Sequence, residues 1–283
     1  MSYDEWIGKV KDRNDSMAPE QLQRFEALMN RKPQSVTKGT PLPACAHWCY
    51  FTPIDMQSEL AVDGHARKGD FLPPVELPKR MWAGGKITFK KPLLAGVPAE
   101  KKSTIIAINE KDGSSGKLCF VTIRHQISAK GALAIDEEQQ LVYREESEEG
   151  AHPIRTKPLD IDSDWKISTR PDSIQLFRFS ALTFNSHRIH YDLDYVKKME
   201  GYPNIVVHGP YLLVLMLDAF KNKDDGRVIE DVEYRAVGPV YLGEQITIHG
   251  KGVDNHRTEL RVTGHEGNLA MTATVNWTYS WNR

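Results

Sequence analysis

One segment constrains the fold more than any other. Residues 209–222, GPYLLVLMLDAFKN, are apolar around almost the whole circumference of a helix. Gly209 opens the segment and Pro210 lies in its first turn, where a missing N–H leaves no hydrogen bond unmade, so the segment is predicted to be helical. A helix that is apolar on nearly every side is buried on most of them. The rest of the fold therefore has to enclose it.

Strands are predicted to supply that enclosure. Alternating apolar and polar residues after the helix indicate strands in VEYRAVGPVY, EQITIHGKGV, RTELRVTGH and LAMTATVNWTYSW. A further strand is predicted ahead of the helix, in SIQLFRFSALTF at 173–184. The first half shows the same alternation between 86 and 143, in KITFKKPLL, STIIAINEKD, LCFVTIRHQISAK and QLVYRE, with KDGSSGK as a turn.

The N-terminal region looks different. Residues 4–30 have apolar side chains at helical spacing and are predicted to form one or two amphipathic helices: Trp6, Ile7, Val10, Leu22, Phe25, Leu28 and Met29. The stretch 41–85 is rich in proline and glycine, which favours short strands and long loops.

Two local matches indicate that the halves are related. Pro92 and Gly96 in KKPLLAG correspond to Pro239 and Gly243 in VGPVYLG. GALA, beginning at residue 131, precedes a tyrosine by twelve residues, as GNLA does from residue 267. Chance matching remains the alternative, but the shared order favours a duplication.

The predicted fold class follows from this pattern. An antiparallel sheet wrapped around one helix is the hot-dog architecture, so the chain is expected to be an α+β double hot-dog whose first half has reduced or lost the central helix. The acidic, proline-containing stretch EESEEGAHPIRTKPLDIDSD reads as a linker, which gives halves of 1–150 and 151–283. A reduced helix would leave the first half room for a bulky acyl group.

Composition excludes several classes of protein. The 37 basic and 38 acidic side chains give a net charge of -1, so nucleic acid is not an expected partner. The 3 cysteines are too few for a disulfide framework, and Cys45 and Cys49 with His47 do not complete a zinc site, so no metal is expected. No secretory signal or bilayer-spanning window is found, which favours a cytoplasmic protein without a membrane partner.

The stretch SALTFNSHRIHYD, residues 180–192, concentrates groups that hold or transfer protons: Asn185, His187, His190 and Asp192. Each has a structural alternative. The histidines could be core or surface residues, Asn185 could stabilise a turn, and Asp192 could cap the helix that follows it.

These residues resemble a known family. FRFSALTFNSHRIHYD, followed by YPNIVVHGPYLLVLMLDAF, is similar to the motif of MaoC-like, R-specific enoyl-thioester hydratases and dehydratases. In the first half, HWCYFTP, DGH, FLPP and LPKRMWAGGKITF resemble a tandem hot-dog subgroup. That subgroup contains mitochondrial-type 3-hydroxyacyl-thioester dehydratases and bacterial hydratases acting on itaconyl-CoA or mesaconyl-CoA. The resemblance covers nearly the whole chain.

The chain departs from the family in one place. The family has an Asp, then an Asn two residues later and a His three further on, and the matching positions here hold Asn185, His187 and His190. An amide can hold water but cannot take its proton, so the resemblance makes His190 the expected general base. His187 or Asp192 is left to fill the role of the missing carboxylate. Gly209 is expected to donate its N–H to the enolate-like oxygen at the helix N-terminus.

Other parts of the site are less constrained. Trp82 is expected either to line the pocket or to anchor the core, and the phosphates of CoA would need basic partners such as Arg188 and Arg235. The resemblance implies an acyl-CoA substrate, no separate cofactor and a homodimer.

The predicted activity is reversible hydration of an α,β-unsaturated acyl-CoA by a hydro-lyase. A five-carbon dicarboxylic substrate is favoured, itaconyl-CoA giving citramalyl-CoA, or mesaconyl-CoA. Three alternatives stay open: a 3-hydroxyacyl-thioester dehydratase of fatty-acid synthesis, a hot-dog acyl-CoA thioesterase, and an acyl-thioester binding module without activity.

Overall fold

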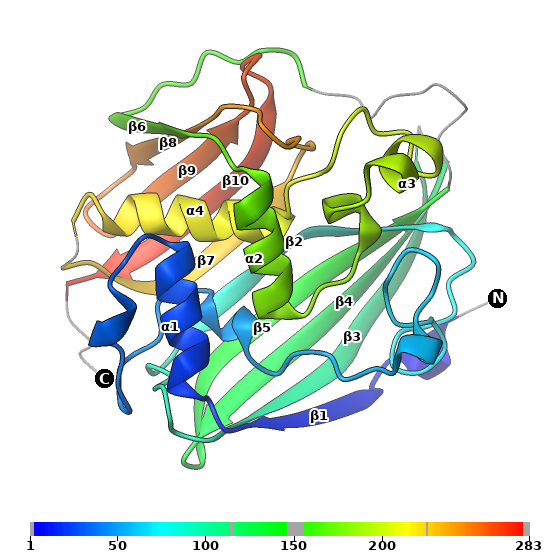
Figure 1. Ribbon diagram of the computed structural model, residues 1–283, viewed down its shortest axis with the longest axis horizontal. Coiled ribbons are helices and arrows are strands. Elements are labelled where there is room, and N and C mark those ends of the chain that lie inside the picture. The colour runs from blue at the N-terminus through cyan, green and yellow to red at the C-terminus, as the bar shows by residue number, and fades with distance from the viewer. Residues whose placement is uncertain (1–2, 114–115, 146–155, 225, 280–283) are drawn as a thin grey trace. The chain divides into compact units, whose positions relative to one another are not determined.

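The computed structural model describes residues 3–113, 116–145, 156–224 and 226–279 (Figure 1). The chain forms two compact units: unit 1 is Met1–Glu148 with Leu182–Ser186, and unit 2 is Glu149–Ala181 with His187–Arg283. The predicted boundary at 150/151 and much of the predicted linker lie outside the described residues, as do Ser114 and Ser115 in the predicted turn.

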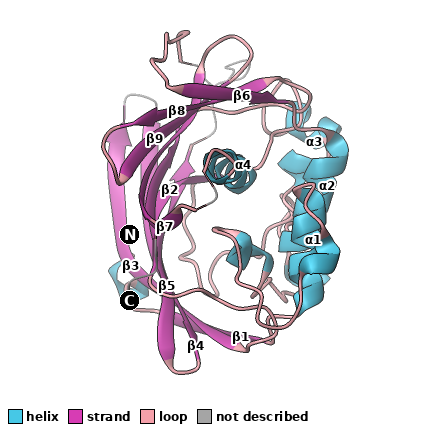
Figure 2. Cartoon of the chain, turned by 90° about the vertical axis from the view of Figure 1, so that its left-hand side faces the viewer, coloured by secondary structure: helices cyan, strands magenta, loops and turns pink. Residues whose placement is uncertain are grey.

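Unit 2 is an antiparallel sheet with a long helix on its inner face. The strands neighbour one another in the order β6 (Trp165–Thr169), β8 (Ile246–Gly252), β9 (Arg257–Thr263), β10 (Leu269–Thr278) and β7 (Val228–Ala236). The helix α4 (Gly209–Lys221) contacts β8, β9 and β10, and Figure 2 shows it end-on with these strands curving around it. The predicted helix and the four predicted strands after it are confirmed.

The sequence explains why α4 lies at the centre of this unit. Tyr211, Leu213, Met216 and Phe220 have no exposed surface. Burying one such side chain stabilises the fold by about 1.5–3 kcal/mol, which exceeds what helix propensity alone supplies. The helix is therefore held by its apolar surface against the sheet.

Unit 1 repeats the same strand order. Its strands are β1 (Val10–Asp15), β3 (Ala99–Gly113), β4 (Gly116–Ala129), β5 (Ala132–Arg144) and β2 (Lys79–Phe89). Matched positions also share backbone geometry, with φ of 71° at Gly96 and 79° at Gly243, and 74° at Gly131 and 78° at Gly267. These positive φ values favour glycine at both turns of both units. The predicted relationship between the halves is confirmed in topology.

The helices differ between the units. Unit 1 contains η1 (Asp4–Trp6), α1 (Pro19–Leu28), η2 (Pro33–Ser35), η3 (Ala46–Cys49) and η4 (Gln57–Glu59). Unit 2 contains α2 (Ser173–Thr183, which runs into the unit 1 segment), η5 (Arg188–His190), α3 (Leu193–Lys198) and α4. In chain order, unit 1 has only the short helices η3 and η4 ahead of β2, where unit 2 has α4 ahead of β7. The expected reduction of the central helix in the first half is thus observed.

Two predictions of local structure were wrong. The segment 173–184 is helical, not a strand: Asp172 accepts from the Gln175 N–H at 2.8 Å, while the Gln175 side chain accepts from the Asp172 N–H at 3.0 Å. This reciprocal pair is a capping box, and it starts α2. Near the N-terminus, Val10–Asp15 is not helical but pairs with β3 as a strand.

Two further features bear on the class of protein. Cys45, Cys49 and Cys119 are buried free thiols. In the part of the chain that the structure describes, no helix has the length and apolar character needed to cross a membrane.

Candidate active site

The short helix η5 brings two histidines of unit 2 together. His187 precedes η5 as its N-cap residue, and its carbonyl accepts the backbone N–H of His190 at 3.1 Å. This single turn sets the two imidazoles edge to face with ring centroids 5.5 Å apart. His187 is buried and His190 is half-buried. The predicted pair is therefore a structural unit.

A second contact fixes the tautomer of His190. Its Nδ1 lies 2.8 Å from the carbonyl oxygen of Val206, while the Val206 N–H donates to the carbonyl of Ile189 at 2.9 Å. A carbonyl only accepts, so Nδ1 carries the proton in this hydrogen bond. In the neutral ring, Nε2 then holds the lone pair, which is the form a general base needs.

His208, which the sequence analysis did not select, completes the cluster. Its ring stacks on that of His190 with centroids 3.6 Å apart and planes 19° apart. Its Nε2 is 2.8 Å from the Ser180 hydroxyl, and among the described residues its buried Nδ1 has no hydrogen-bond partner. Burial, with further contributions from His190 and His187, puts the pKa of His208 well below its usual value. His208 is therefore neutral near pH 7.

The helix α4 starts next to this cluster. His208 is its N-cap residue and Gly209 is its first residue. N–H groups in the first turn of a helix have no intrahelical acceptor and carry the positive end of the helix dipole. Gly209 thus follows directly on the residue that stacks against His190. The cluster offers a histidine base and an N–H donor for a developing oxyanion.

Asp192 and Arg188 have local structural roles. Asp192 Oδ1 accepts the Tyr195 N–H at 3.0 Å and caps α3, and its Oδ2 pairs with Arg188 Nη2 at 2.7 Å. Both contacts lower the pKa of Asp192. The Arg188 guanidinium also lies 4.3 Å from the centroid of the Tyr195 ring. The capping alternative for Asp192 is confirmed, and Arg188 pairs with Asp192 within this turn.

The other selected residues lie elsewhere. Asn185 is on Leu182–Ser186, the segment that belongs to unit 1, where the Ser186 hydroxyl donates to the Gly64 carbonyl. Trp82 lies in β2 of unit 1, with its ring edge to face with Trp48 at 6.1 Å between centroids. Arg235 is an exposed residue of β7 in unit 2, opposite Thr272 of β10. The structure thus places Asn185 and Trp82 in unit 1 and Arg235 on β7, whereas the histidine cluster belongs to unit 2.

The fold and the cluster define a class of protein: a double hot-dog with a cluster of histidines beside the N-terminus of its central helix. The chain belongs to the hydroxyacyl-thioester dehydratase type 2 family, whose model matches residues 45–242. An enzyme of the hydro-lyase class, acting on acyl thioesters by hydration or dehydration, is thereby confirmed.

Two relatives are similar along most of their length. A mesaconyl-C(4)-CoA hydratase of Chloroflexus aurantiacus is 38% identical over 273 residues, which cover 95% of this chain and 96% of the relative. The mitochondrial hydroxyacyl-thioester dehydratase type 2 of Schizosaccharomyces pombe is 28% identical over 238 residues, 75% of this chain and 78% of the relative.

Solved structures support the fold. A MaoC-like dehydratase from Phytophthora capsici superposes with a TM-score of 0.73 at 14% identity, covering 100% of both chains. A Mycobacterium tuberculosis protein described as having a double hot-dog fold gives a TM-score of 0.58 at 11% identity, covering 96% of both chains. The predicted fold class is confirmed.

Proposed function

We propose that the enzyme adds water reversibly across the α,β double bond of a five-carbon dicarboxylic acyl-CoA, with His190 as the general base. The observation that carries this proposal is the hydrogen bond from His190 Nδ1 to the Val206 carbonyl at 2.8 Å. It leaves Nε2 as the basic nitrogen of the neutral ring, which is the group that must accept a proton from water.

The reaction uses few groups. His190 takes a proton from water while the water oxygen forms its bond to the β carbon of the enoyl thioester. The electron pair of the double bond moves onto the thioester oxygen as an enolate. A proton then reaches the α carbon, from the imidazolium or from solvent, so that the product is the 3-hydroxyacyl thioester and the base is regenerated.

The growing negative charge needs a donor that does not have to move. The N–H of Gly209, in the first turn of α4, supplies one without a side chain in the way. His208 supports the base from behind as a neutral ring stacked against His190. Asn185 is the proposed holder of the water, since an amide binds water at any pH but takes no proton from it.

The choice of substrate rests on similarity. The relative that is 38% identical is named a mesaconyl-C(4)-CoA hydratase, so mesaconyl-CoA is the substrate we propose first. Itaconyl-CoA, which would give citramalyl-CoA, has the same kind of branched dicarboxylic acyl group, but its double bond has to move into conjugation with the thioester before this addition, so it is the second candidate.

A panel of acyl-CoA esters tests both the proposed reaction and the proposed substrate. Mesaconyl-, itaconyl- and crotonyl-CoA are incubated with the enzyme, and the products are analysed by mass spectrometry. We expect the mass of one water to be added to mesaconyl-CoA with no release of CoA thiol. Release of free thiol would instead identify a thioesterase, and binding of the ester without any product would identify a module without activity.

One alternative substrate is supported by the family itself. The matching family model describes a hydroxyacyl-thioester dehydratase, which runs the same chemistry in the direction of water loss. In that case the substrate is a 3-hydroxyacyl chain without a second carboxylate. A preference for 3-hydroxyacyl thioesters of increasing chain length, on CoA or on acyl-carrier protein, over the dicarboxylic esters would establish it.

A further inference from the structure

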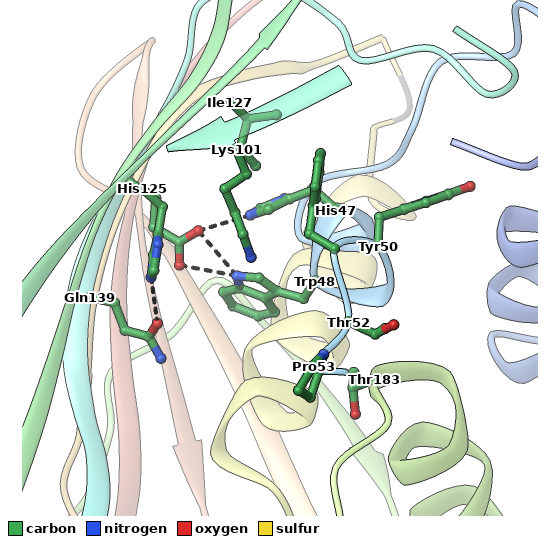
Figure 3. A pocket seen from close by; sticks show the side chains of 12 residues that line it. His47, Trp48, Tyr50, Thr52, Pro53, Lys101, His125, Ile127, Gln139 and Thr183 are labelled. Atoms are coloured by element: carbon green, nitrogen blue, oxygen red, sulfur yellow. Dashed lines mark hydrogen bonds and ion pairs between the residues drawn. The ribbon is translucent and has the colours of Figure 1, made fainter. Parts of the chain in front are cut away.

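Unit 1 holds a polar cavity that has no part in the proton transfer proposed for His190. It has a volume of about 140 Å³. Residues on the inner face of the sheet and around η3 line it, as Figure 3 shows: His47, Trp48, Tyr50, Phe51, Thr52, Pro53, Lys101, His125, Ile127, Glu137, Gln139 and Thr183. A volume of this size holds a small organic group rather than a long acyl chain.

Two polar side chains on one wall, the buried Glu137 and the half-buried His125, are already paired. Glu137 accepts from His47 Nε2 at 3.0 Å and from Trp48 Nε1 at 3.0 Å, and these hydrogen bonds lower the pKa of its carboxyl against the effect of burial. His125 is held between the Ser103 hydroxyl at 2.8 Å and the Gln139 side chain at 3.1 Å. The carboxylate and this imidazole therefore have their partners within the protein.

Lys101 has none. Its side chain points into the cavity between His125 and Trp48 (Figure 3). Among the residues that the structure describes, its ammonium makes no hydrogen bond or ion pair, and its one contact with a ring is to Phe51, 5.3 Å from the centroid. A partly buried ammonium without an acceptor is unfavourable by itself, because it has lost hydration without gaining a partner.

Unit 2 shows that this fold does not require polar residues at the positions that line the cavity in unit 1. Aligning the matched glycines and following the strand registers places Lys101 opposite Ile127, as Ile248 lies opposite Val262 in unit 2. In the same alignment, three polar residues of unit 1 correspond to buried apolar residues of unit 2. His125 corresponds to Leu260, Glu137 to Ala273 and Gln139 to Val275. Unit 2 fills these positions to pack against α4, whereas unit 1 places polar groups around a cavity.

The wall of the cavity is held in a fixed shape. Asp15 accepts the N–H of Phe51 at 2.8 Å, which keeps that residue at a φ of 52°. The Gln21 side chain donates to the carbonyls of Cys49 at 2.7 Å and Leu182 at 2.8 Å, and so ties η3 to the segment that carries Thr183. Strained backbone that is held this firmly is typical of binding sites.

We propose that this cavity is a recognition pocket for a carboxylate, with the Lys101 ammonium as its charge partner and the Gln139 amide as a second donor. The pocket fits one carboxylate on a short carbon chain. Two ligands have this chemistry. One is the second carboxylate of a dicarboxylic acyl group, and this version rests on the proposed function. The other is a small free organic acid.

The first experiment compares two acyl-CoA esters in two variants. Lys101→Met removes the ammonium, while Lys102→Met is the matched control because Lys102 is exposed and its side chain points to the other face of β3. We expect Lys101→Met to lower kcat/KM for mesaconyl-CoA about 10- to 100-fold, the effect of losing a charged hydrogen bond, and to leave kcat/KM for crotonyl-CoA unchanged. The control should behave like the wild type with both esters.

Calorimetry with sodium mesaconate, in the absence of CoA esters, is the second experiment. Binding by the wild type that disappears in Lys101→Met supports the pocket even if mesaconyl-CoA proves not to be a substrate, and then identifies a free acid as the ligand. A selective loss with mesaconyl-CoA identifies the acyl group. The pocket is disproved if Lys101→Met reduces turnover of both esters equally, or of neither, and mesaconate binding does not depend on Lys101.

Discussion

The imidazole rings of His190 and His208 lie 3.6 Å apart between centroids, nearly parallel, with His208 completely buried beneath the half-buried ring. A flat neutral ring in this place fixes the orientation of His190 without competing for its proton, since burial keeps the pKa of His208 well below its usual value. The stack thus joins His190, the proposed base, to His208, the N-cap residue of α4.

This arrangement predicts different results for two substitutions of His208. His208→Phe keeps a flat ring under His190 and should retain most of kcat, whereas His208→Ala removes it and should lower kcat about tenfold with little change in KM. Steady-state kinetics with mesaconyl-CoA measures both. If the two variants lose activity equally, the stacked ring does not orient the base.

Acid should destabilise the fold through its buried histidines. Burial lowers the pKa of His125 to about 4 and that of His208 well below 6.5. Between pH 6.5 and 4 the unfolded chain therefore binds protons that the folded chain does not, so the free energy of unfolding falls as pH falls. The slope is at most about 1.4 kcal/mol per pH unit for each such histidine.

Urea denaturation at several pH values checks this expectation. His125→Gln keeps a polar side chain that cannot be protonated, and it should make the slope between pH 6.5 and 4 shallower than that of the wild type. Equal slopes for the two proteins would contradict the assignment of His125 as a buried neutral histidine.

Lys101 should lower the stability of the protein without ligand. Burial lowers the pKa of Lys101 to about 8. Arg13 lowers this pKa further, whereas Glu137 and Asp15 raise it by less than burial lowers it. The penalty for the charged form is fully present below pH 8 and is relieved as pH rises from 8 towards 10.5. Lys101→Met should therefore raise the free energy of unfolding at pH 7 by about 1–2 kcal/mol. The measurement is urea denaturation beside Lys102→Met, and a destabilised Lys101→Met would count against an unpaired ammonium.

Restoring the family carboxylate should alter the pH dependence of turnover. Asn185→Asp introduces a group that must be ionised to act as a base, so the profile of kcat/KM should acquire an additional fall on the acidic side. His187→Ala tests whether His187 carries that role in the wild type, in which case it removes a limb of the wild-type profile. Unchanged profiles in both variants would show that neither position takes part in proton transfer.

The sequence predicted the central part of unit 2 well, because its signals are local. The apolar surface of 209–221 requires an enclosing sheet, and the strands of that sheet alternate clearly. The strand assigned to 173–184 failed because its run of apolar residues also fits a helix. Leu176 and Phe179, three residues apart, are the buried ones, whereas Phe177 is exposed. The capping box at Asp172 was the signal that could have decided between them.

Other features depend on the tertiary structure. Val10–Asp15 is mostly polar and becomes a strand only because β3 offers it hydrogen bonds. His190 could be selected from the motif, but its partners His208 and Val206 are contributed by a loop some sixteen residues later. The sequence HGPY, at the start of a buried helix, was the available sign of His208. Lys101 and Glu137 carried no local signal, because alternating strands place charged residues on exposed faces as often as in cavities.

His190 is proposed to remove the proton from water as the water adds to the enoyl thioester. The most direct test follows the loss of the enoyl-thioester absorbance of mesaconyl-CoA with wild-type enzyme and with His190→Gln, which keeps a polar side chain but cannot act as a base near pH 7. We predict that the wild type forms a product heavier by one water and that His190→Gln lowers kcat about 100- to 10,000-fold with KM little changed. Turnover by His190→Gln at the wild-type rate would rule out His190 as the general base.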